Sequence, residues 1–227
     1  MRSPAIVFLS LFAPAAASAQ TGATCRPNPH LARALESYRN VDYSGAAGVL
    51  QRAIEYYGNC RDDLAEIYRL KGTIDAIHGE RERCQRDFEI FLALRPSFTP
   101  GSKEPGKIQS CLELALATPP EKREIHLEVQ LAAKVEPKTP VPVRIEVRDP
   151  LRLVAEVQVL FRREGLKVYT VLEARADDRL SVVIPSLALP ADGGYAVEYF
   201  VRAVDRWGGT LAEVGSAKAP LRFWVGP

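Results

Sequence analysis

The apolar residues of this 227-residue chain change their period once, at Thr118-Pro119-Pro120. Before this point they recur every three or four positions, which is the spacing of one face of an α-helix. After it they alternate with polar residues, as in half-buried β-strands. Each part is about 100 residues long, which is enough to bury a core of its own. We therefore expect an α+β chain with an all-α domain at residues 24–118, a linker at 119–122 and an antiparallel β-sandwich domain at 123–227.

The first 19 residues have the features of a secretory signal peptide. Arg2 supplies a positive start, and Ala5–Ala13 form an apolar stretch too short to span a membrane. Ala17-Ser18-Ala19 matches the small-residue pattern that precedes a cleavage site. We expect cleavage after Ala19, a mature chain that begins near Gln20, and a periplasmic or secreted product.

A lipid anchor and a membrane-spanning segment are the alternatives to export as an unanchored protein. A lipid anchor on Cys25 is disfavoured because Thr24 stands where lipoprotein signals carry Gly, Ala or Ser. An integral membrane segment is not expected, because no later stretch approaches the ~20 apolar residues of a membrane-spanning helix.

The formal net charge is only +2, spread evenly over both halves, whereas phosphate binding needs a concentrated basic surface. We therefore expect no nucleic-acid partner.

Five helices are expected in the first part, from the apolar spacing and from the Gly, Asn and Pro residues that end helices. Their approximate ranges are 28–39, 44–57, 62–78, 80–94 and 105–117. The third and fourth form an antiparallel hairpin within the stretch Ala65–Pro96, with the turn at His78-Gly79. The first and second helices form a weaker copy of this unit, so stacked helical hairpins are expected.

The four cysteines all lie in this helical part, and an exported chain meets an oxidising compartment in which disulfides persist. Cys25 and Cys60 each lie at the entrance to the first helix of a hairpin, and such entrances are neighbours in a stack. Cys84 lies on the second helix of the central hairpin, and Cys111 on the helix expected to pack next. We therefore predict the disulfides Cys25–Cys60 and Cys84–Cys111. The alternative is a cysteine that serves only as a small buried side chain; a metal site is disfavoured because no two cysteines are close in sequence.

The central hairpin carries five residues at the separations found between the aromatic, glycine, small, second aromatic and proline positions of a tetratricopeptide repeat: Tyr68, Gly72, Cys84, Phe88 and Pro96. Lys71 and Asp75 depart from that family's pattern. From about residue 27 to residue 118, the chain resembles two tetratricopeptide repeats followed by a capping helix.

The resemblance implies a binding surface. In that family the first helices of successive hairpins line a concave face that binds extended peptides or protein partners. The residues of this chain that the resemblance places on such a face are Leu35, Tyr38, Glu66, Arg69 and Thr73. The alternative is that these residues form a solvated helix surface or lie against the second domain.

About seven short strands are expected after the linker, which favours an antiparallel β-sandwich. Their approximate ranges are 125–131, 141–147, 157–161, 167–173, 180–184, 195–204 and 221–225. The run from Gly194 to Gly209 resembles the penultimate strand and following turn of fibronectin type III and other immunoglobulin-like domains. That resemblance points alternate residues from Tyr195 to Ala203 into the core.

Three aromatic residues of the sandwich are candidates for a binding patch. Phe200 lies on the face of its strand opposite the core residues, Trp224 alternates away from its apolar neighbours, and Trp207 lies in a turn. The alternative is that this aromatic face packs on the helical part or is covered by residues 211–219.

Enzyme chemistry is not expected. His30, His78 and His126 have no spacing that would bring two of them onto one face. Asp177-Asp178 is better explained as a turn than as a catalytic pair, and the chain has neither a Gly-rich phosphate loop after a strand nor a Gly-x-Ser-x-Gly elbow. We expect a protein with no metal or cofactor.

These patterns lead to an exported, non-catalytic adaptor or scaffold that binds protein partners in the cell envelope. The alternative function is a carbohydrate- or cell-wall-binding module in which the sandwich recognises glycan through Trp207 or Trp224. A third function is an accessory domain pair of a larger enzyme or secretion machine. All three are hypotheses by analogy with the families that the chain resembles.

Overall fold

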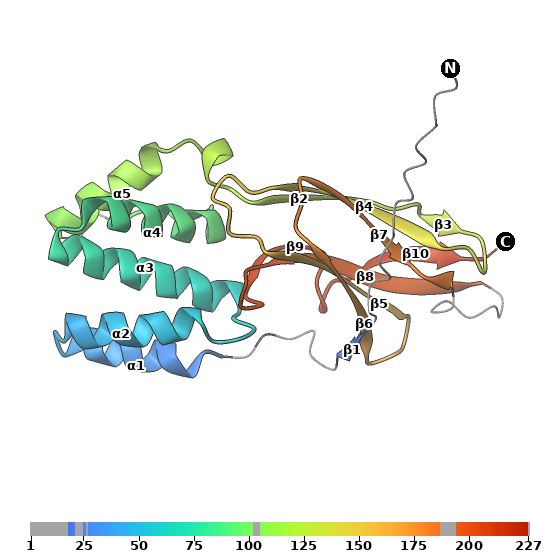
Figure 1. Cartoon of the computed structure of the whole chain (residues 1–227), viewed down its shortest axis with the longest axis horizontal. Helices are drawn as coiled ribbons and strands as arrows, with labels where there is room; N and C mark the ends of the chain where they lie inside the picture. The colour runs from blue at the N-terminus through green and yellow to red at the C-terminus, as the bar shows by residue number, and fades with distance from the viewer. Residues whose placement is uncertain (1–17, 21–24, 26, 102–104, 187–193, 227) are drawn as a thin grey trace, which may run out of the picture.

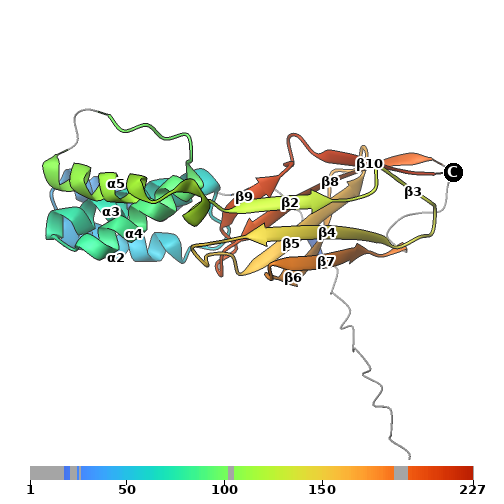
Figure 2. The ribbon, with the colours of Figure 1, turned by 90° about the horizontal axis from the view of Figure 1, so that it is seen from above.

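The computed structural model describes residues 18–20, 25, 27–101, 105–186 and 194–226. The protein has a mixed α+β fold, with helices in the N-terminal part and sheets in the C-terminal part (Figure 1). Figure 2 shows the helices gathered at one end of the molecule and the strands at the other. Most of the expected leader lies outside the described residues.

Five helices form the N-terminal part, as the sequence predicts: α1 (Pro29–Arg39), α2 (Tyr43–Ile54), α3 (Arg61–His78), α4 (Arg81–Leu94) and α5 (Gly106–Ala117). The helix ends follow from local chemistry. At the start of α1, Asn28 Oδ1 accepts hydrogen bonds from the backbone N–H groups of His30 and Leu31. At the end of α3, Gly79 has a φ of 81°, a conformation that glycine adopts without a steric penalty.

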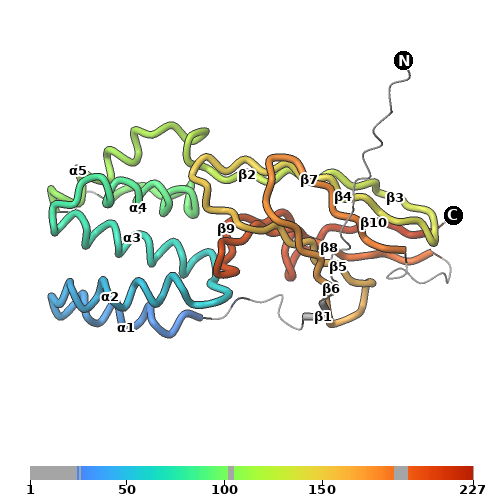
Figure 3. The backbone as a smooth tube through the Cα atoms, viewed as in Figure 1, coloured from blue at the N-terminus to red at the C-terminus, as the bar shows by residue number. Residues whose placement is uncertain are grey.

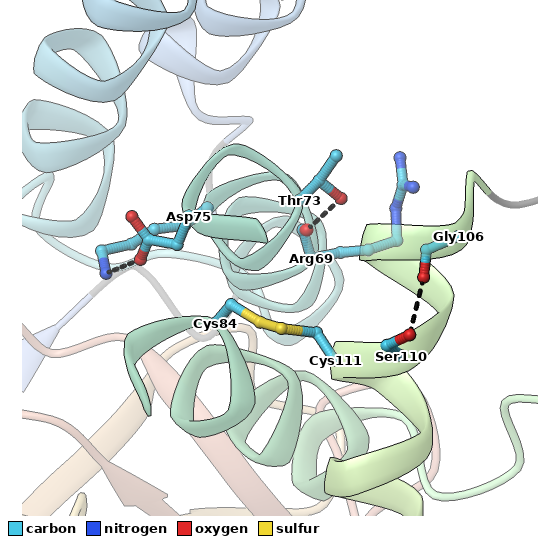
Figure 4. The surroundings of a disulfide bond; sticks show 8 residues. Arg69, Thr73, Asp75, Cys84, Gly106, Ser110 and Cys111 are labelled. Carbon is cyan, nitrogen blue, oxygen red and sulfur yellow. Dashed lines mark hydrogen bonds and ion pairs between the residues drawn. A yellow bond between two sulfur atoms is a disulfide. The ribbon is translucent and has the colours of Figure 1, made fainter. Parts of the chain in front are cut away.

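Both predicted disulfides are present in the helical part. Cys25 is joined to Cys60 and Cys84 to Cys111, with Cα–Cα distances of 4.9 and 6.1 Å. The first ties the segment before α1 to the start of α3, and the second ties α4 to α5 (Figure 4). Each bond therefore joins segments that are neighbours in space but belong to different hairpins or helices.

Two sheets form the C-terminal part, after a single 3-10 turn, η1 (Pro120–Lys122). The smaller sheet is antiparallel and has the order β2 (His126–Gln130), β4 (Val141–Arg148), β7 (Arg179–Ile184). The larger sheet has the order β1 (Ser18–Gln20), β6 (Tyr169–Arg175), β5 (Glu156–Arg163), β8 (Tyr195–Val204), β10 (Leu221–Val225), β3 (Lys134–Val135). A further strand, β9 (Thr210–Val214), pairs with β8.

The sheets differ from the sequence prediction in two respects. All seven predicted strands are found, but β1, β3 and β9 were not predicted. In addition, β3 pairs with β10 in parallel, so the large sheet is not purely antiparallel. A two-residue strand such as β3 is too short for an alternating pattern to reveal it.

The core of the sandwich lies between the two sheets. In β4 every second residue is buried, from Val141 to Val147. These side chains meet the inward-facing residues of the large sheet, among them Val159 of β5 and Val201 of β8. Of the alternate β8 residues expected in this core, Tyr195, Val197, Tyr199 and Val201 lie in it, whereas Ala203 packs in a second cluster.

The helical part and the sandwich share a second apolar cluster. It contains Leu64 of α3 and Phe91 of α4 together with Leu211 and Ala212 of β9. Two backbone hydrogen bonds cross the junction: Gly58 N–H donates to the Trp207 carbonyl, and Thr210 N–H donates to the Asn59 carbonyl, both at 3.0 Å. In Figure 3 the backbone leading into β9 lies against the sandwich end of α3. The separate domain boundaries proposed from the sequence stay a prediction.

Candidate functional site

The face of α3 that the sequence assigns to partner binding carries an ion pair. Arg69 donates from Nε and Nη2 to the two carboxylate oxygens of Glu66, at 2.9 and 2.6 Å. The side chains are 35% and 24% exposed, so both charges remain accessible from outside. Thr73 is buried one turn further, and its hydroxyl donates to the Arg69 carbonyl at 2.9 Å. Figure 4 shows Arg69 and Thr73 on one side of α3 and Asp75 on the other.

The two predicted residues of α1 are packing residues as well as surface residues. Leu35 and Tyr38 are half-buried against an apolar cluster that includes Ile67 and Leu70 of α3. The ring of Tyr38 also contacts Tyr43, with centroids 5.6 Å apart. The five predicted residues thus lie on two packed helices, and their exposed polar groups are concentrated at Glu66 and Arg69.

A recess lies near the end of the helical part that is remote from the sandwich. It measures about 400 Å³ and is lined by residues of α3, α4 and α5 and of the turn between α3 and α4, including Arg81, Lys107 and Ser110. Cys111 of the second disulfide also lines it. This recess adds concave surface with two basic side chains to the helical part.

A polar cluster on the other side of α3, with two buried aspartates and a half-buried lysine, was not predicted. Lys71 Nζ lies 2.6 Å from Asp87 Oδ2 and 3.5 Å from Asp75 Oδ2. Burial raises the pKa of Asp87 to about 7; the hydrogen bond and charge of Lys71 oppose this shift, and the neighbouring Asp75 adds to it. The signal in the sequence was the departure of Lys71 and Asp75 from the repeat pattern, which placed charged residues on a helix side that packs against α4.

Two titratable groups at the junction between the helices and the sandwich also have shifted pKa values. Burial raises the pKa of Tyr68 to about 12, and the charges of Asp205 and Asp87 add to this shift. Asp205 accepts hydrogen bonds from the backbone N–H groups of Trp207 and Gly209, both at 2.8 Å, and burial raises the pKa of its carboxyl. These hydrogen bonds fix the conformation of the turn between β8 and β9, which packs against the helical part at the junction.

Trp207 lies within this turn and not on an open surface. Its half-buried side chain packs against the apolar cluster of α1, α2 and α3. The indole N–H is buried and has no hydrogen-bond partner in the described part of the chain. Trp207 therefore joins the sandwich to the helices.

Phe200 is also covered. It is 1% exposed and belongs to a small cluster on the outer face of the large sheet, with Leu160, Tyr169 and Val171. The rings of Phe200 and Tyr169 meet edge to face, with centroids 5.1 Å apart. Ala217 packs on this cluster, so residues 211–219 cover Phe200, which was the alternative considered from the sequence.

Trp224 is the aromatic candidate that remains accessible, with 44% of its surface exposed. It lies on β10 opposite Ala196 of β8. Gly194 and Gly226 approach its ring so closely that a Cβ on either would collide with it. One part of the indole is therefore packed, and another part faces outward.

The described residues include no group of three or more His, Cys, Asp or Glu side chains placed to hold a metal ion. None of the described helices has the length and hydrophobicity needed to cross a membrane. In comparisons with known proteins, no family profile matches the chain and no curated protein is significantly similar to it in sequence.

Proposed function

We propose that this chain is an exported, non-catalytic adaptor that binds protein partners in the cell envelope. In this proposal the helical part is tetratricopeptide-repeat-like and presents the partner-binding surface, and the sandwich is immunoglobulin-like. The observation that carries the proposal is the apolar cluster shared by α3, α4 and β9. A buried junction holds the helical surface at a fixed position relative to the sandwich, which is what an adaptor needs to present two surfaces at once.

The helical surface has the chemistry of a protein-binding patch. Arg69 and Glu66 hold each other in a two-point contact, which fixes the geometry of both charges. Arginine is enriched at binding hot spots because it combines hydrogen bonding with a long apolar stem. The side chains of Leu35 and Tyr38 supply neighbouring half-buried apolar area.

The two disulfides fit an oxidising compartment, which agrees with the leader-like sequence of the first 19 residues. Export to the periplasm or cell exterior is part of the proposal. A partner would then be another envelope or secreted protein.

The test uses the full exported chain as bait in an envelope extract, with captured proteins identified by mass spectrometry and their binding remeasured with purified components. The key variant is Arg69→Glu. The matched control is Arg83→Glu, because Glu80–Arg83 is an ion pair of the same types and the same i,i+3 spacing at the start of α4. The proposal predicts that Arg69→Glu weakens binding of the purified partner about tenfold or more, the range of a charged hot-spot residue, and that Arg83→Glu does not. Equal binding by both variants would refute the assignment of the surface.

A glycan-binding function is the second candidate, and the exposed indole of Trp224 is the observation that favours it. A flat aromatic side chain offers a stacking surface for a sugar ring. Sedimentation of the protein with purified cell wall tests this function: retention that is lost in Trp224→Ala would support it. Trp207→Ala is not a clean test, because Trp207 packs at the junction.

A further inference from the structure

The edge of the large sheet at β6 is covered by the end of the leader. β1 pairs antiparallel with β6, with Ser18 opposite Val171, Ala19 opposite Thr170 and Gln20 opposite Tyr169. The bond expected to be cut on export joins Ala19 to Gln20, so it lies inside β1. Removal of the leader would leave only Gln20 of this strand, and β6 would become the edge of the sheet.

The exposed edge lacks the usual protection against pairing. Natural sheets protect their edges with charged residues, proline or bulges. The first four residues of β6, Tyr169–Leu172, are uncharged and contain no proline. The charged residues Glu173 and Arg175 come only after the three positions that pair with β1. β2, an edge of the other sheet, has instead a histidine and a glutamate among its five residues.

The surroundings of this edge favour an apolar partner residue. Val171 is fully buried in the outer-face cluster with Leu160 and Phe200. Side chains directly opposite each other in an antiparallel pair lie on the same face and contact each other. A residue opposite Val171 would therefore extend this cluster. Leu166 and Val168, in the turn that precedes β6, are 57% and 45% exposed and add apolar surface at the end of the edge.

We propose that removal of the leader opens the β6 edge, and that this edge binds an extended segment of a partner protein by β-strand addition. The segment runs antiparallel to Tyr169–Val171 and has a β-branched apolar residue opposite Val171. Main-chain hydrogen bonds supply the affinity, and the residue opposite Val171 supplies the selectivity. This inference rests on the proposed function in taking a protein as the ligand, but it concerns a different surface.

The experiment titrates the ¹⁵N-labelled mature protein, exported so that the cell processes it, with synthetic nine-residue peptides. The first probe has the sequence of residues 15–23, and the second replaces its residue 18 by valine. We expect amide shifts at Tyr169–Val171 and none at β2, the control edge. The valine peptide should bind about 1.5- to 5-fold more tightly, the range measured for cross-strand pairs.

Two further peptides test the strand geometry without changing the protein. One carries a backbone N-methyl group at position 19, and the other carries N-methyl groups at positions 18 and 20. Only alternate amides of an added strand point toward β6, so one peptide should lose binding and the other should keep it. The proposal would be overturned if both N-methylated peptides lost binding equally, if the amides of β2 and β6 shifted equally, or if no amide shifted. So would a mature N-terminus that still contains Ser18, or β6 shifts that depend on protein concentration alone, which would indicate a second copy of the chain.

The outcome is separable from that of the proposed function. The peptide titration needs no native partner, and Arg69→Glu should leave it unchanged because Arg69 lies on α3. If Arg69→Glu does not weaken partner binding, the amide shifts at Tyr169–Val171 still decide whether β6 binds an extended segment.

Discussion

The substitution Leu64→Ala tests whether the helices and the sandwich unfold as one unit. Leu64 has no exposed surface and lies in the cluster shared by α3, α4 and β9. Its Cδ1 packs directly on Gly209, where an added Cβ would come within 2.9 Å of it. The substitution removes a fully buried α3 side chain from this contact and leaves a cavity between the two parts.

The expected cost is about 2–5 kcal/mol, the range for Leu→Ala at a fully buried position. It should fall near the upper end, because the backbone of Gly209 on one side and α4 on the other limit how far the site can collapse. A loss of this size is a large share of the about 5–15 kcal/mol that stabilises a typical domain.

Urea unfolding followed by two probes measures the effect. Circular dichroism at 222 nm reports mainly on the helices, and the fluorescence of Trp224, in a Trp207→Phe background, reports on the sandwich. If the junction couples the two parts, both curves shift to lower urea by the same amount. A helix curve that shifts while the Trp224 curve stays in place would show independent unfolding, and the argument for a fixed adaptor geometry would fail.

Three further predictions concern single features. Replacing Cys84 and Cys111 together by serine should lower the free energy of unfolding by about 3.5 kcal/mol, from the loop entropy of a separation of 27 residues, as measured by urea unfolding; an unchanged midpoint would contradict this. The folded-state pKa of Asp87, about 7, lies above its unfolded value, so its contribution to stability is complete below about pH 4 and is lost as pH rises through 7. The slope should not exceed about 1.4 kcal/mol per pH unit and should flatten in Asp87→Asn; parallel pH profiles for the two proteins would refute it. Gly208→Ala should lower the melting temperature more than Gly165→Ala: both glycines have positive φ, but only at Gly208 would the new Cβ meet the Tyr57 ring, at 2.9 Å. Equal decreases in melting temperature would contradict this prediction and show that the Tyr57 ring moves aside.

Local pattern was sufficient to predict most elements. All five helices and seven of the strands were expected from period, helix-ending residues and turn residues, since these signals act over a few neighbouring positions. The pairing of the four cysteines followed from the same helices, because hairpin entrances become neighbours once hairpins stack. Strand β3 was missed because two residues are too few to show alternation, and β9 was missed because its first three residues are all buried and so do not alternate.

The candidate surface was harder to predict than the fold. The sequence left open whether Phe200 and Trp207 form a binding patch or are covered; Phe200 is covered near Ala217, and Trp207 packs against the helices. Both are covered by segments whose position depends on contacts distant in sequence, which periodicity does not reveal. The Lys71–Asp75–Asp87 cluster was indicated only indirectly, by two charged residues at positions where the repeat pattern does not have them.

The junction explains how so short a helical array can be stable. An array of two hairpins is near the lower limit of what stacking alone supports, because each unit buries only the faces that touch its neighbours. In this chain, two disulfides tie the helices together, and the turn between β8 and β9 inserts its backbone against α3. The sandwich thereby contributes to the helical core, and the helices cover the end of the sandwich. The junction therefore fixes where the α3 surface and the β6 edge lie relative to each other, and Leu64→Ala is the variant that would loosen this arrangement.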